Sequence, residues 1–393
     1  MRPIPLAQPY LTQADKQAVL QVLEGSHLSL GAKLYEFESW MAGYVNAKYA
    51  VAVNSGTSAL HLCIKSLRIK EGDEVITTPF SFIASSNCIL YEKATPVFVD
   101  IDPATYNIDA NKIKEKITAK TKAILPVHVF GLPCDMLRLQ AIAQKHHLKI
   151  IEDACEAIGA TCRTVATGSS GKNGQLKQHK VGALGDCGAF GFYPNKQITT
   201  GEGGAVVTND QAIARNCKSL RNQGRSNNTQ WLEHDQLGYN YRIDELSCAL
   251  GIAQLAQIEQ ILAKREKVAA WYNARLNSIK ELILPPKRPN RRQSWFVYVV
   301  RLQDEFNKSD RDEILNRLQK SGIECRCYFP PLHLQPFYVK KFGYKRGDFP
   351  NTEHVADRTI ALPFFTGMIE EQVDRVCAVF KRILKDHKCA ALN

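Results

Sequence analysis

Residues Ala189 to Gly204 read AFGFYPNKQITTGEGG, and this stretch decides how the whole chain is interpreted. It places Lys196 between an aromatic, apolar run and a cluster of glycines. Aromatic side chains can keep water away from such a turn, and glycines let the backbone approach a bound group closely. A lysine held there is a candidate covalent nucleophile, although most lysines are simply solvated on loops. Evidence from the rest of the sequence is needed to decide between a nucleophile and a solvated lysine.

A second candidate segment lies near the N-terminus. The apolar strand expected at residues 49–53 runs directly into Ser55, Gly56 and Thr57 and then into a helical pattern. Backbone N–H groups and hydroxyls at a helix N-terminus suit a phosphate group. The same residues would also serve as an ordinary helix cap, so this turn alone leaves both interpretations open.

Strands and helices alternate through the first half of the chain, which predicts a mostly parallel sheet covered by helices on both faces. The expected strands are residues 74–77, 96–100, 123–127, 148–152, 187–192 and 205–208, and the expected helices are residues 81–91, 109–117, 135–146 and 210–220. Ligands of such sheets bind beyond the carboxyl ends of the strands. Phe82, His128 and Asp153 follow strand ends, so we expect them to meet the turn that carries Lys196.

The C-terminal third changes in composition and predicts a second, smaller α+β domain. A long helical pattern from Leu246 to Leu262 could link the two domains, which we place at residues 1–255 and 256–393. The smaller domain should contain strands at residues 295–301 and 323–327 and helices at residues 309–321 and 369–384. The polar excursion from Thr161 to Lys180 is expected to be a long surface hairpin or loop.

Composition and charge restrict the class of function. Hydrophobic residues make up 45% and charged residues 23% of the 393 residues, as in ordinary globular domains. No apolar run is long enough to span a membrane, and prolines interrupt the N-terminal segment, so we expect a cytoplasmic protein without a membrane partner. The formal charge of +12 fits an anionic small substrate better than nucleic acid. The basic residues are dispersed, and their one dense cluster, residues 287–292, contains no aromatic side chain.

The 12 cysteines are scattered through apolar contexts, where thiols pack as small hydrophobic groups. None forms a Cys-x-x-Cys pair, so no metal site is expected. Cys325 and Cys327 form the closest couple, and their spacing suits alternating residues of a strand.

Three predicted features together match the needs of pyridoxal 5'-phosphate (PLP). This cofactor is held through its aldehyde by a lysine, through its ring nitrogen by a carboxylate, and through its phosphate by backbone and hydroxyl donors. Lys196, Asp153 and the turn that begins at Ser55 supply these groups. An aromatic side chain stacked on the ring would complete the site.

The chain closely resembles the DegT family of nucleotide-sugar aminotransferases, which are PLP enzymes of fold type I, the aspartate aminotransferase type. The resemblance covers nearly the whole chain and is carried by the motifs NSGTSALHL, GDEVITTPFSFIAS, PVFVDIDPATYNID, PVHVFG, IEDACEAIGA, FYPNKQITTGEGGAVVTND, LGYNYRIDEL and YFPPLHLQPFY. Each motif alone is weak, but the set is specific. It implies an α/β fold with a large PLP-binding domain and a smaller C-terminal α+β domain.

The resemblance implies a role for each matching cofactor residue. Lys196 would form the Schiff base with PLP and later move the proton between the two reacting carbon atoms. Asp153 would pair with the ring nitrogen, and Phe82 would stack on the ring. Gly56 and Thr57 would bind the phosphate.

Other matching residues concern a partner chain and the substrate. Asn240, in GYNYR, would reach the phosphate of the cofactor bound by a second subunit, which implies a homodimer with shared active sites. Tyr328 and His333, in YFPPLHLQ, lie where the family often contacts substrate. His61 is interpreted as a packed or capping histidine.

The sequence departs from the common family pattern in several places. Gly191 replaces a serine that binds phosphate in many members, so that contact must come from elsewhere. Glu156 replaces a glutamine near the cofactor's ring hydroxyl and could alter the protonation of the ring. The excursion from Thr161 to Lys180 is longer than usual and could touch substrate, a neighbouring subunit or nothing.

The resemblance implies ping-pong transamination from glutamate to a keto-sugar carried on a nucleoside diphosphate. Some members have histidine in place of the lysine and act as sugar dehydratases, so Lys196 favours transamination. A PLP-dependent dehydratase or epimerase on the same fold is the alternative among enzymes. A regulatory or nucleic-acid-binding protein that keeps the fold without the activity is the alternative outside enzymes.

Overall fold

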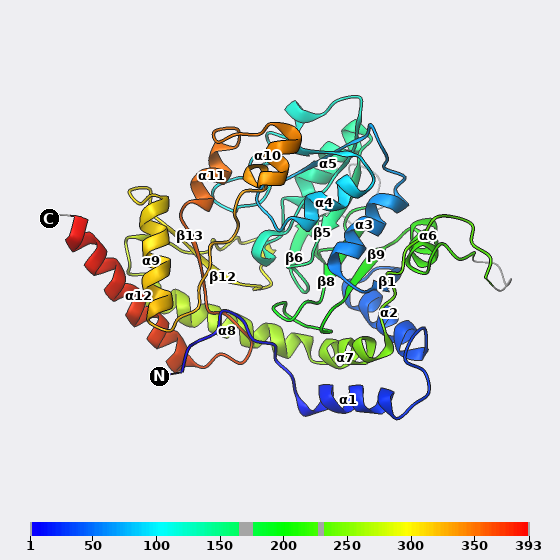
Figure 1. Ribbon diagram of the computed structural model, residues 1–393, viewed down its shortest axis with the longest axis horizontal. Helices are drawn as coiled ribbons and strands as arrows, with labels where there is room; N and C mark the ends of the chain where they lie inside the picture. The colour runs from blue at the N-terminus through cyan, green and yellow to red at the C-terminus, as the bar shows by residue number, and fades with distance from the viewer. Residues whose placement is uncertain (1, 165–175, 227–231, 392–393) are drawn as a thin grey trace.

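The computed structural model describes residues 2–164, 176–226 and 232–391. Its largest sheet has seven strands in the order β1-β9-β8-β5-β4-β2-β3. The strands are β1 (Tyr49–Val53), β2 (Glu74–Thr77), β3 (Thr95–Phe98), β4 (Thr121–Ile124), β5 (Lys149–Asp153), β8 (Cys187–Gly191) and β9 (Gly204–Thr208). β9 runs antiparallel to both of its neighbours, whereas the strands from β8 to β3 are parallel. The prediction of an α/β fold with a mostly parallel sheet is confirmed (Figure 1).

Helices cover both faces of this sheet, because successive side chains of a strand point to opposite sides. In β1, Ala50 and Ala52 belong to one apolar cluster, whereas Val51 and Val53 belong to another. The first cluster includes residues of α2 (Ala32–Val45), α5 (Met136–His146), α7 (Glu245–Ala256) and α8 (Ile258–Leu276). The second includes residues of α3 (Gly56–Ser66), α4 (Ala84–Tyr91) and α6 (Gln211–Arg221).

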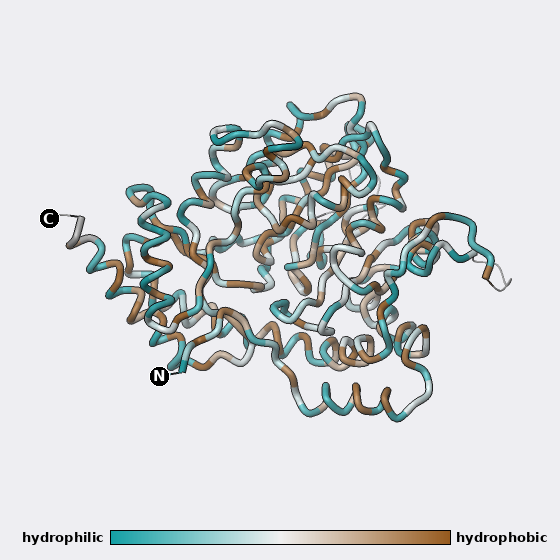
Figure 2. Tube along the Cα trace, in the orientation of Figure 1, coloured by the Kyte–Doolittle hydropathy of each residue, from teal (hydrophilic) through white to brown (hydrophobic). Residues whose placement is uncertain are grey.

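A second sheet of three antiparallel strands lies in the C-terminal third. Its order is β10 (Leu282–Ile283), β12 (Tyr298–Leu302) and β13 (Thr359–Leu362). The helices α9 (Lys308–Lys320) and α12 (Glu370–Ala391) share a third apolar cluster with it. Figure 2 shows hydrophilic and hydrophobic stretches alternating along α12, as expected for a helix with one buried face. The division into domains at residues 1–255 and 256–393 stays a prediction.

The polar excursion forms a hairpin at its base. The strands β6 (Thr161–Thr164) and β7 (Lys177–Lys180) pair antiparallel, and β6 also pairs with β11 (Arg291–Arg292). The predicted hairpin is therefore confirmed where the chain is described, and residues 165–175 lie outside the described residues. Four short helices were not predicted: η2 (Val129–Gly131), η3 (Leu332–Leu334), α10 (Pro336–Phe342) and α11 (Pro350–Ala356).

The helix predicted at residues 109–117 is wrong. Only the short 3-10 helix η1 (Lys114–Lys116) forms there. The side chains of Asp102 and Asp109 each accept a backbone N–H two residues further on, which favours local turns over a regular helix.

The strand predicted at residues 323–327 is also wrong. Ile323 bridges to the N-terminal arm, whereas Arg326 bridges to β13, so no continuous ladder forms. Cys325 and Cys327 are free thiols outside any strand. The alternating pattern reflects burial of single side chains and not strand pairing.

The long helix predicted from Leu246 to Leu262 is interrupted at Gln257, where α7 and α8 meet at an angle of 65°. The carboxamide of Gln257 donates to Asp15 and Thr12 at the start of α1 (Gln13–Leu23). In the ranges that the structure describes, no single helix is long and apolar enough to cross a membrane, and α7 with α8 passes that test only as a bent pair.

Candidate active site

The antiparallel strand β9 explains why distant segments meet at one edge of the large sheet. Its first residue, Gly204, pairs with Val53 at the end of β1 and with Gly191 at the end of β8. A Cβ atom on Gly204 would lie 2.4 Å from the carbonyl oxygen of Ser55, so this approach requires glycine. Asp153 ends β5 beside β8. The predicted site segments therefore share this edge.

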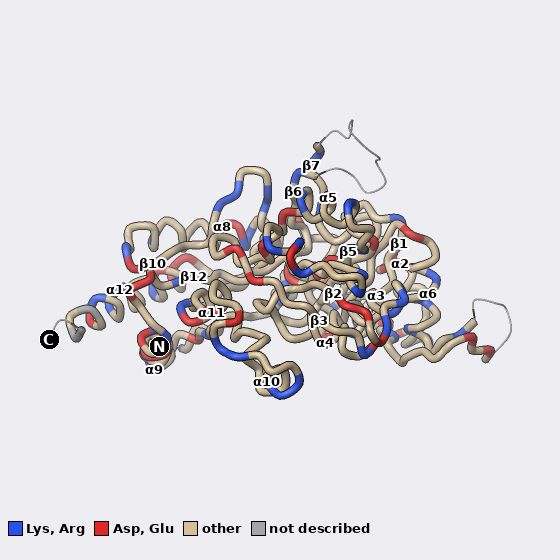
Figure 3. Tube along the Cα trace, turned by 90° about the horizontal axis from the view of Figure 1, so that it is seen from above, with Lys and Arg blue, Asp and Glu red and all other residues tan. Residues whose placement is uncertain are grey.

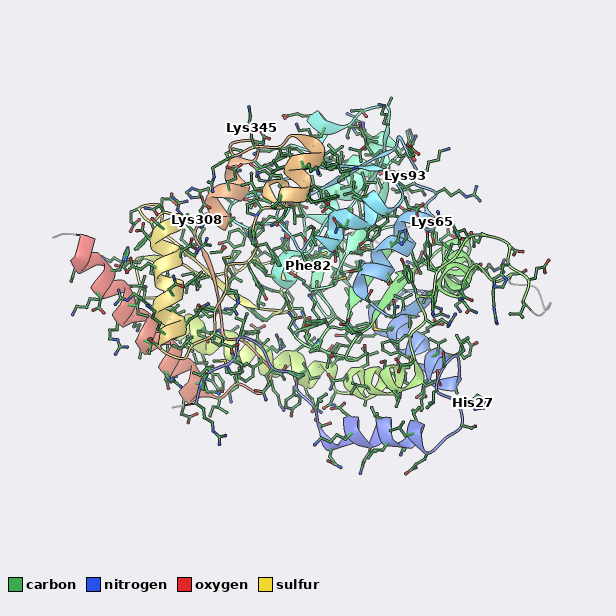
Figure 4. All side chains as sticks on the ribbon, viewed as in Figure 1. His27, Lys65, Phe82, Lys93, Lys308 and Lys345 are labelled. Atoms are coloured by element: carbon green, nitrogen blue, oxygen red, sulfur yellow. The ribbon has the colours of Figure 1, made fainter. Side chains whose placement is uncertain are left out.

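A pocket of about 660 Å³ opens there. It brings together most of the residues predicted to bind cofactor or substrate: Gly56, Thr57, Phe82, Asp153, Glu156, Lys196 and Tyr328. Figure 4 places Phe82 near the middle of the molecule, and its side chain is 62% exposed. The ring of Phe82 is therefore free to contact a ligand in the pocket.

Lys196 lies in a part of the pocket with little access to water, since only 15% of its side chain is exposed. Its Nζ atom lies 3.9 Å above the centre of the Phe296 ring and 3.8 Å from Oε1 of Glu156. The solvated-loop interpretation of this lysine is therefore wrong. Phe296 was not predicted, because nothing in the sequence around it marks a residue that packs on a lysine far earlier in the chain.

Asp153 is buried and its carboxylate is held at both oxygens. Oδ2 accepts a hydrogen bond from the hydroxyl of Ser85 at 2.6 Å, and Oδ1 accepts from the backbone N–H of Cys155 at 3.1 Å. The hydroxyl of Ser85 lies 2.7 Å from that of Ser81. Both serines line the pocket and were missed, although they stand in the quoted motif GDEVITTPFSFIAS.

Glu156 places a second carboxyl group beside the lysine. Its Oε2 atom accepts from the backbone N–H of Phe130 at 2.9 Å, while Oε1 faces Lys196. Burial raises the pKa of Glu156, and the charge of Lys196 acts in the opposite direction. A carboxyl group in this position can hold a proton next to the nitrogen of the lysine.

Tyr328 forms another wall of the pocket and stacks on Phe329, with ring centres 5.0 Å apart. Burial raises the pKa of Tyr328, so its hydroxyl stays neutral at physiological pH. A neutral hydroxyl can donate a hydrogen bond to a ligand or accept one from it.

The turn before α3 serves as a helix cap and still leaves donors for an anion. The hydroxyl of Ser55 accepts the backbone N–H of Ser58 at 3.0 Å. Gly56 and Thr57 occupy the first positions of α3, where backbone N–H groups have no partner within a helix. The cap and phosphate interpretations of this turn are therefore compatible.

Asn240 does not line the pocket and is exposed. The side chain of Asn54 donates to the carbonyl oxygen of Asn240 at 3.4 Å, so this residue stands beside the segment that leads into Ser55. An exposed position next to the pocket leaves the side chain free for a second chain.

His333 is also outside the pocket, and its side chain has no exposed surface. Its Nε2 atom lies 3.0 Å from Oε1 of Glu353. The expected contact of His333 with substrate is corrected on this point, because the imidazole is packed inside the fold.

His61 is packed, as predicted, and it joins a hydrogen-bond network. Its ring lies 2.9 Å from a carboxylate oxygen of Glu92 and 3.0 Å from the hydroxyl of Tyr241, and Lys65 donates to the same carboxylate at 2.7 Å. Burial lowers the pKa of His61, so the neutral ring donates from Nε2 to Glu92 and accepts from Tyr241 at Nδ1. The network therefore ties α3 to the segment that carries Asn240.

The residues of the pocket fit PLP. A buried carboxylate, a shielded lysine and a helix N-terminus face one cavity, which is the donor set that this cofactor needs. Gly56 and Gly191 approach so closely that a Cβ on Gly56 would lie 3.2 Å from Cα of Gly191, so the backbones of α3 and β8 come together at this end of the pocket. No three His, Cys, Asp or Glu side chains of the described residues are grouped to hold a metal ion.

Comparison with known proteins gives one consistent result. Residues 9–381 match the model of the DegT/DnrJ/EryC1/StrS aminotransferase family. The chain is 38% identical to a GDP-perosamine synthase of Caulobacter vibrioides, over 97% of this chain and 98% of that one. It is 35% identical to a UDP-N-acetyl-3-dehydro-alpha-D-glucosamine 3-aminotransferase of Acidithiobacillus ferrooxidans, over 97% of this chain and 95% of that one.

A solved structure gives the same result for the fold. The chain is similar to Helicobacter pylori PseC, an aminotransferase involved in the biosynthesis of pseudoaminic acid, with a TM-score of 0.89. The two sequences are 28% identical, and the match covers 98% of this chain and 100% of the other.

Proposed function

Because the chain belongs to the DegT/DnrJ/EryC1/StrS aminotransferase family, we propose that it transfers an amino group from glutamate to a keto-sugar linked to a nucleoside diphosphate. The family, the dependence on PLP and the aminotransferase activity predicted from the sequence are confirmed. Glutamate as donor rests on the resemblance to the family. The observation that carries the proposal is Lys196, shielded by Phe296 and facing Glu156 in one pocket with Asp153.

Each pocket residue has a physical task in this reaction. PLP, when bound, supplies an aldehyde for the amine and a ring that withdraws electrons. Asp153, whose Oδ2 accepts from the hydroxyl of Ser85, would accept a hydrogen bond from the ring nitrogen. Lys196 would hold the aldehyde through Nζ, and the same nitrogen would carry a proton between the reacting carbon atoms. Phe296, which is buried, keeps water away from the lysine, and the exposed ring of Phe82 is free to stack on the cofactor.

The charge distribution supports a nucleotide-linked acceptor. Figure 3 shows Lys and Arg residues spread along the whole molecule. With a formal charge of +12, this surface attracts a pyrophosphate group without forming the continuous basic stripe of a nucleic-acid-binding protein. We further propose a homodimer in which the exposed Asn240 contacts the cofactor phosphate of the other subunit.

Lys196→Ala tests the function. The variant is expected to lose the visible absorbance of lysine-bound PLP and to transfer amino groups at least about 1000-fold more slowly, since the covalent and proton-transfer steps both depend on Nζ. Absorbance spectra and amino transfer from glutamate to GDP- and UDP-linked keto-sugars measure these effects. Lys381 is exposed on α12, so Lys381→Ala is the matched control. This variant should keep both the visible absorbance and the rate of amino transfer.

The outcomes separate the alternatives. A Lys196→Ala protein that still transfers amino groups would contradict the proposal. Wild-type protein that removes water from the sugar, or inverts a carbon, without consuming glutamate would support a dehydratase or epimerase. Wild-type protein that stays colourless after PLP is added would favour a non-catalytic binding protein.

A further inference from the structure

Two buried serines connect the wall of the pocket to Asp153. The hydroxyl of Ser85 donates to Oδ2 of Asp153 at 2.6 Å, and the hydroxyl oxygens of Ser81 and Ser85 lie 2.7 Å apart. Ser85 stands in the first turn of α4, and Ser81 lies four residues earlier in the chain. The segment that leads into α4 therefore supplies two hydroxyl groups that end on a single carboxylate.

The number of available hydrogen atoms fixes the direction of both hydrogen bonds. An ionised carboxylate accepts but does not donate, so the hydrogen of the Ser85 hydroxyl points to Asp153. Ser85 has no second hydroxyl hydrogen, so the hydroxyl of Ser81 donates to Ser85. Both O–H groups therefore point toward the carboxylate, and successive hydrogen bonds of this kind strengthen one another.

The carboxylate of Asp153 has a donor on each oxygen. Oδ2 receives the hydroxyl of Ser85, and Oδ1 receives the backbone N–H of Cys155 at 3.1 Å. Hydrogen bonds to an ionised group are about twice as strong as those between neutral groups. Donors on both oxygens also hold the plane of the carboxylate in one orientation. Ser81 and Ser85 therefore contribute to both the charge and the direction of this group.

Building on the proposed function, we propose that Ser81 and Ser85 are positioning residues that act on the cofactor ring through Asp153. Their hydroxyl groups hold the carboxylate ionised and oriented to accept a hydrogen bond from the protonated ring nitrogen. PLP withdraws electrons from a reacting carbon more strongly when this nitrogen carries a proton. Both half-reactions therefore depend on the two serines, although neither serine has to touch a substrate.

Ser85→Ala tests the proposal in the PLP-bound protein. Nitrogen NMR of ring-labelled PLP should show the ring-nitrogen signal moving toward its unprotonated position, because Asp153 loses a donor. The dissociation constant of PLP should rise about threefold or more, and both half-reactions should slow about tenfold or more. Ser81→Ala should change the same quantities in the same direction but by less. Added to Ser85→Ala, it should change nothing further, because the link to Asp153 is already broken.

Ser86→Ala is the matched control. Ser86 is the next residue of α4 and is also buried, but its hydroxyl donates to the carbonyl oxygen of Ile83 and accepts from Tyr338. Tyr338 keeps Asn87 as an acceptor in this variant. The nitrogen signal, the dissociation constant and both half-reactions should therefore keep their wild-type values.

Several results would overturn the proposal. An unmoved ring-nitrogen signal in Ser85→Ala would show that the serines do not act on the cofactor through Asp153. Additive effects of the two serine substitutions would show that each acts separately, and equal changes in Ser86→Ala would show that α4 has only a structural role. The NMR and PLP-binding measurements need no sugar. They therefore remain decisive if the wild-type protein reacts with none of the keto-sugars, which is the result that would contradict the proposed function.

Discussion

The structure around Gly191 has room for a larger residue at this position. A Cβ atom on Gly191 would lie 3.5 Å from Cβ and Sγ of Cys155, which is an ordinary van der Waals contact. Gly191 ends β8 and adjoins Gly56, at the end of the pocket where we propose that the phosphate binds. The Cβ atom of a serine therefore fits there, and its hydroxyl would lie at this end of the pocket.

Gly191→Ser is expected to bind PLP about tenfold or more tightly, because a hydrogen bond to a charged group contributes about 1.5–3 kcal/mol. Titration of the apo-protein with PLP, followed by protein fluorescence, measures the dissociation constant. Gly43→Ser is the matched control, since a Cβ atom there meets nothing within 4 Å. An unchanged constant in Gly191→Ser would argue against a phosphate site at this end of the pocket.

Residues that follow strand ends could be predicted from the sequence, because a parallel sheet gathers them at one edge. Lys196 and Asp153 are such residues. Phe296 could not be predicted, since its role comes from packing between segments far apart in the chain. His333 shows the converse: its motif suggested substrate contact, but burial against Glu353 removes it from the pocket.

At the scale of elements, Glu92 is the centre of the network that holds α3 to the segment around Tyr241. Burial acts to raise the pKa of Glu92, but hydrogen bonds from Lys65 and His61 outweigh it and lower the pKa below its ordinary value. A lowered carboxyl pKa stabilises the folded protein above the ordinary glutamate pKa. This stabilisation is lost as pH falls through the lowered pKa.

Glu92→Gln is expected to lower the free energy of unfolding by about 1–3 kcal/mol at neutral pH, because Lys65 and His61 lose a charged acceptor. The difference from wild type should shrink as pH falls below the ordinary glutamate pKa and through the lowered pKa of Glu92, because the carboxylate is protonated there. Urea unfolding of wild type and Glu92→Gln at a series of pH values measures this difference in the free energy of unfolding.

Glu71→Gln is the matched control for this experiment. Glu71 lies 3.7 Å from Lys93, and both side chains are 76% exposed. Exposed ion pairs contribute little, so the change should stay within about 0.5 kcal/mol. Equal losses of unfolding free energy in the two variants would show that the buried network stabilises the protein no more than an exposed ion pair does.

The boundary between α7 and α8 could not be predicted from the sequence. The apolar face of α7 continues into α8, so periodicity alone predicted one helix. At the break, the side chain of Gln257 donates to Asp15, and a contact with a residue so remote in the sequence cannot be read from periodicity. Local patterns therefore identified the elements better than the angles between them.

At the scale of the whole molecule, a shared active site can be tested by mixing subunits. Lys196→Ala and Asn240→Ala chains are each expected to form impaired homodimers. In a mixed dimer, one site combines the intact lysine of the Asn240→Ala chain with the intact asparagine of the Lys196→Ala chain. Random reassortment should therefore restore about a quarter of the wild-type sites.

Amino transfer at limiting PLP, measured before and after the two proteins are unfolded and refolded together, reports this recovery. An activity equal to the average of the two separate variants would contradict shared sites. Each variant refolded alone serves as the control.

The residues of the pocket are synthesised in two groups, one well before the other. Ser55, Asp153 and Lys196 are synthesised well before Phe296 and Tyr328, and domains generally fold from the N-terminus during synthesis. A nascent chain can therefore complete the large sheet while its lysine is still open to water on the side that Phe296 later covers. The complete pocket exists only after the last third of the chain has packed against the large sheet, so an interrupted chain would carry Lys196 and Asp153 without the walls formed by Phe296 and Tyr328.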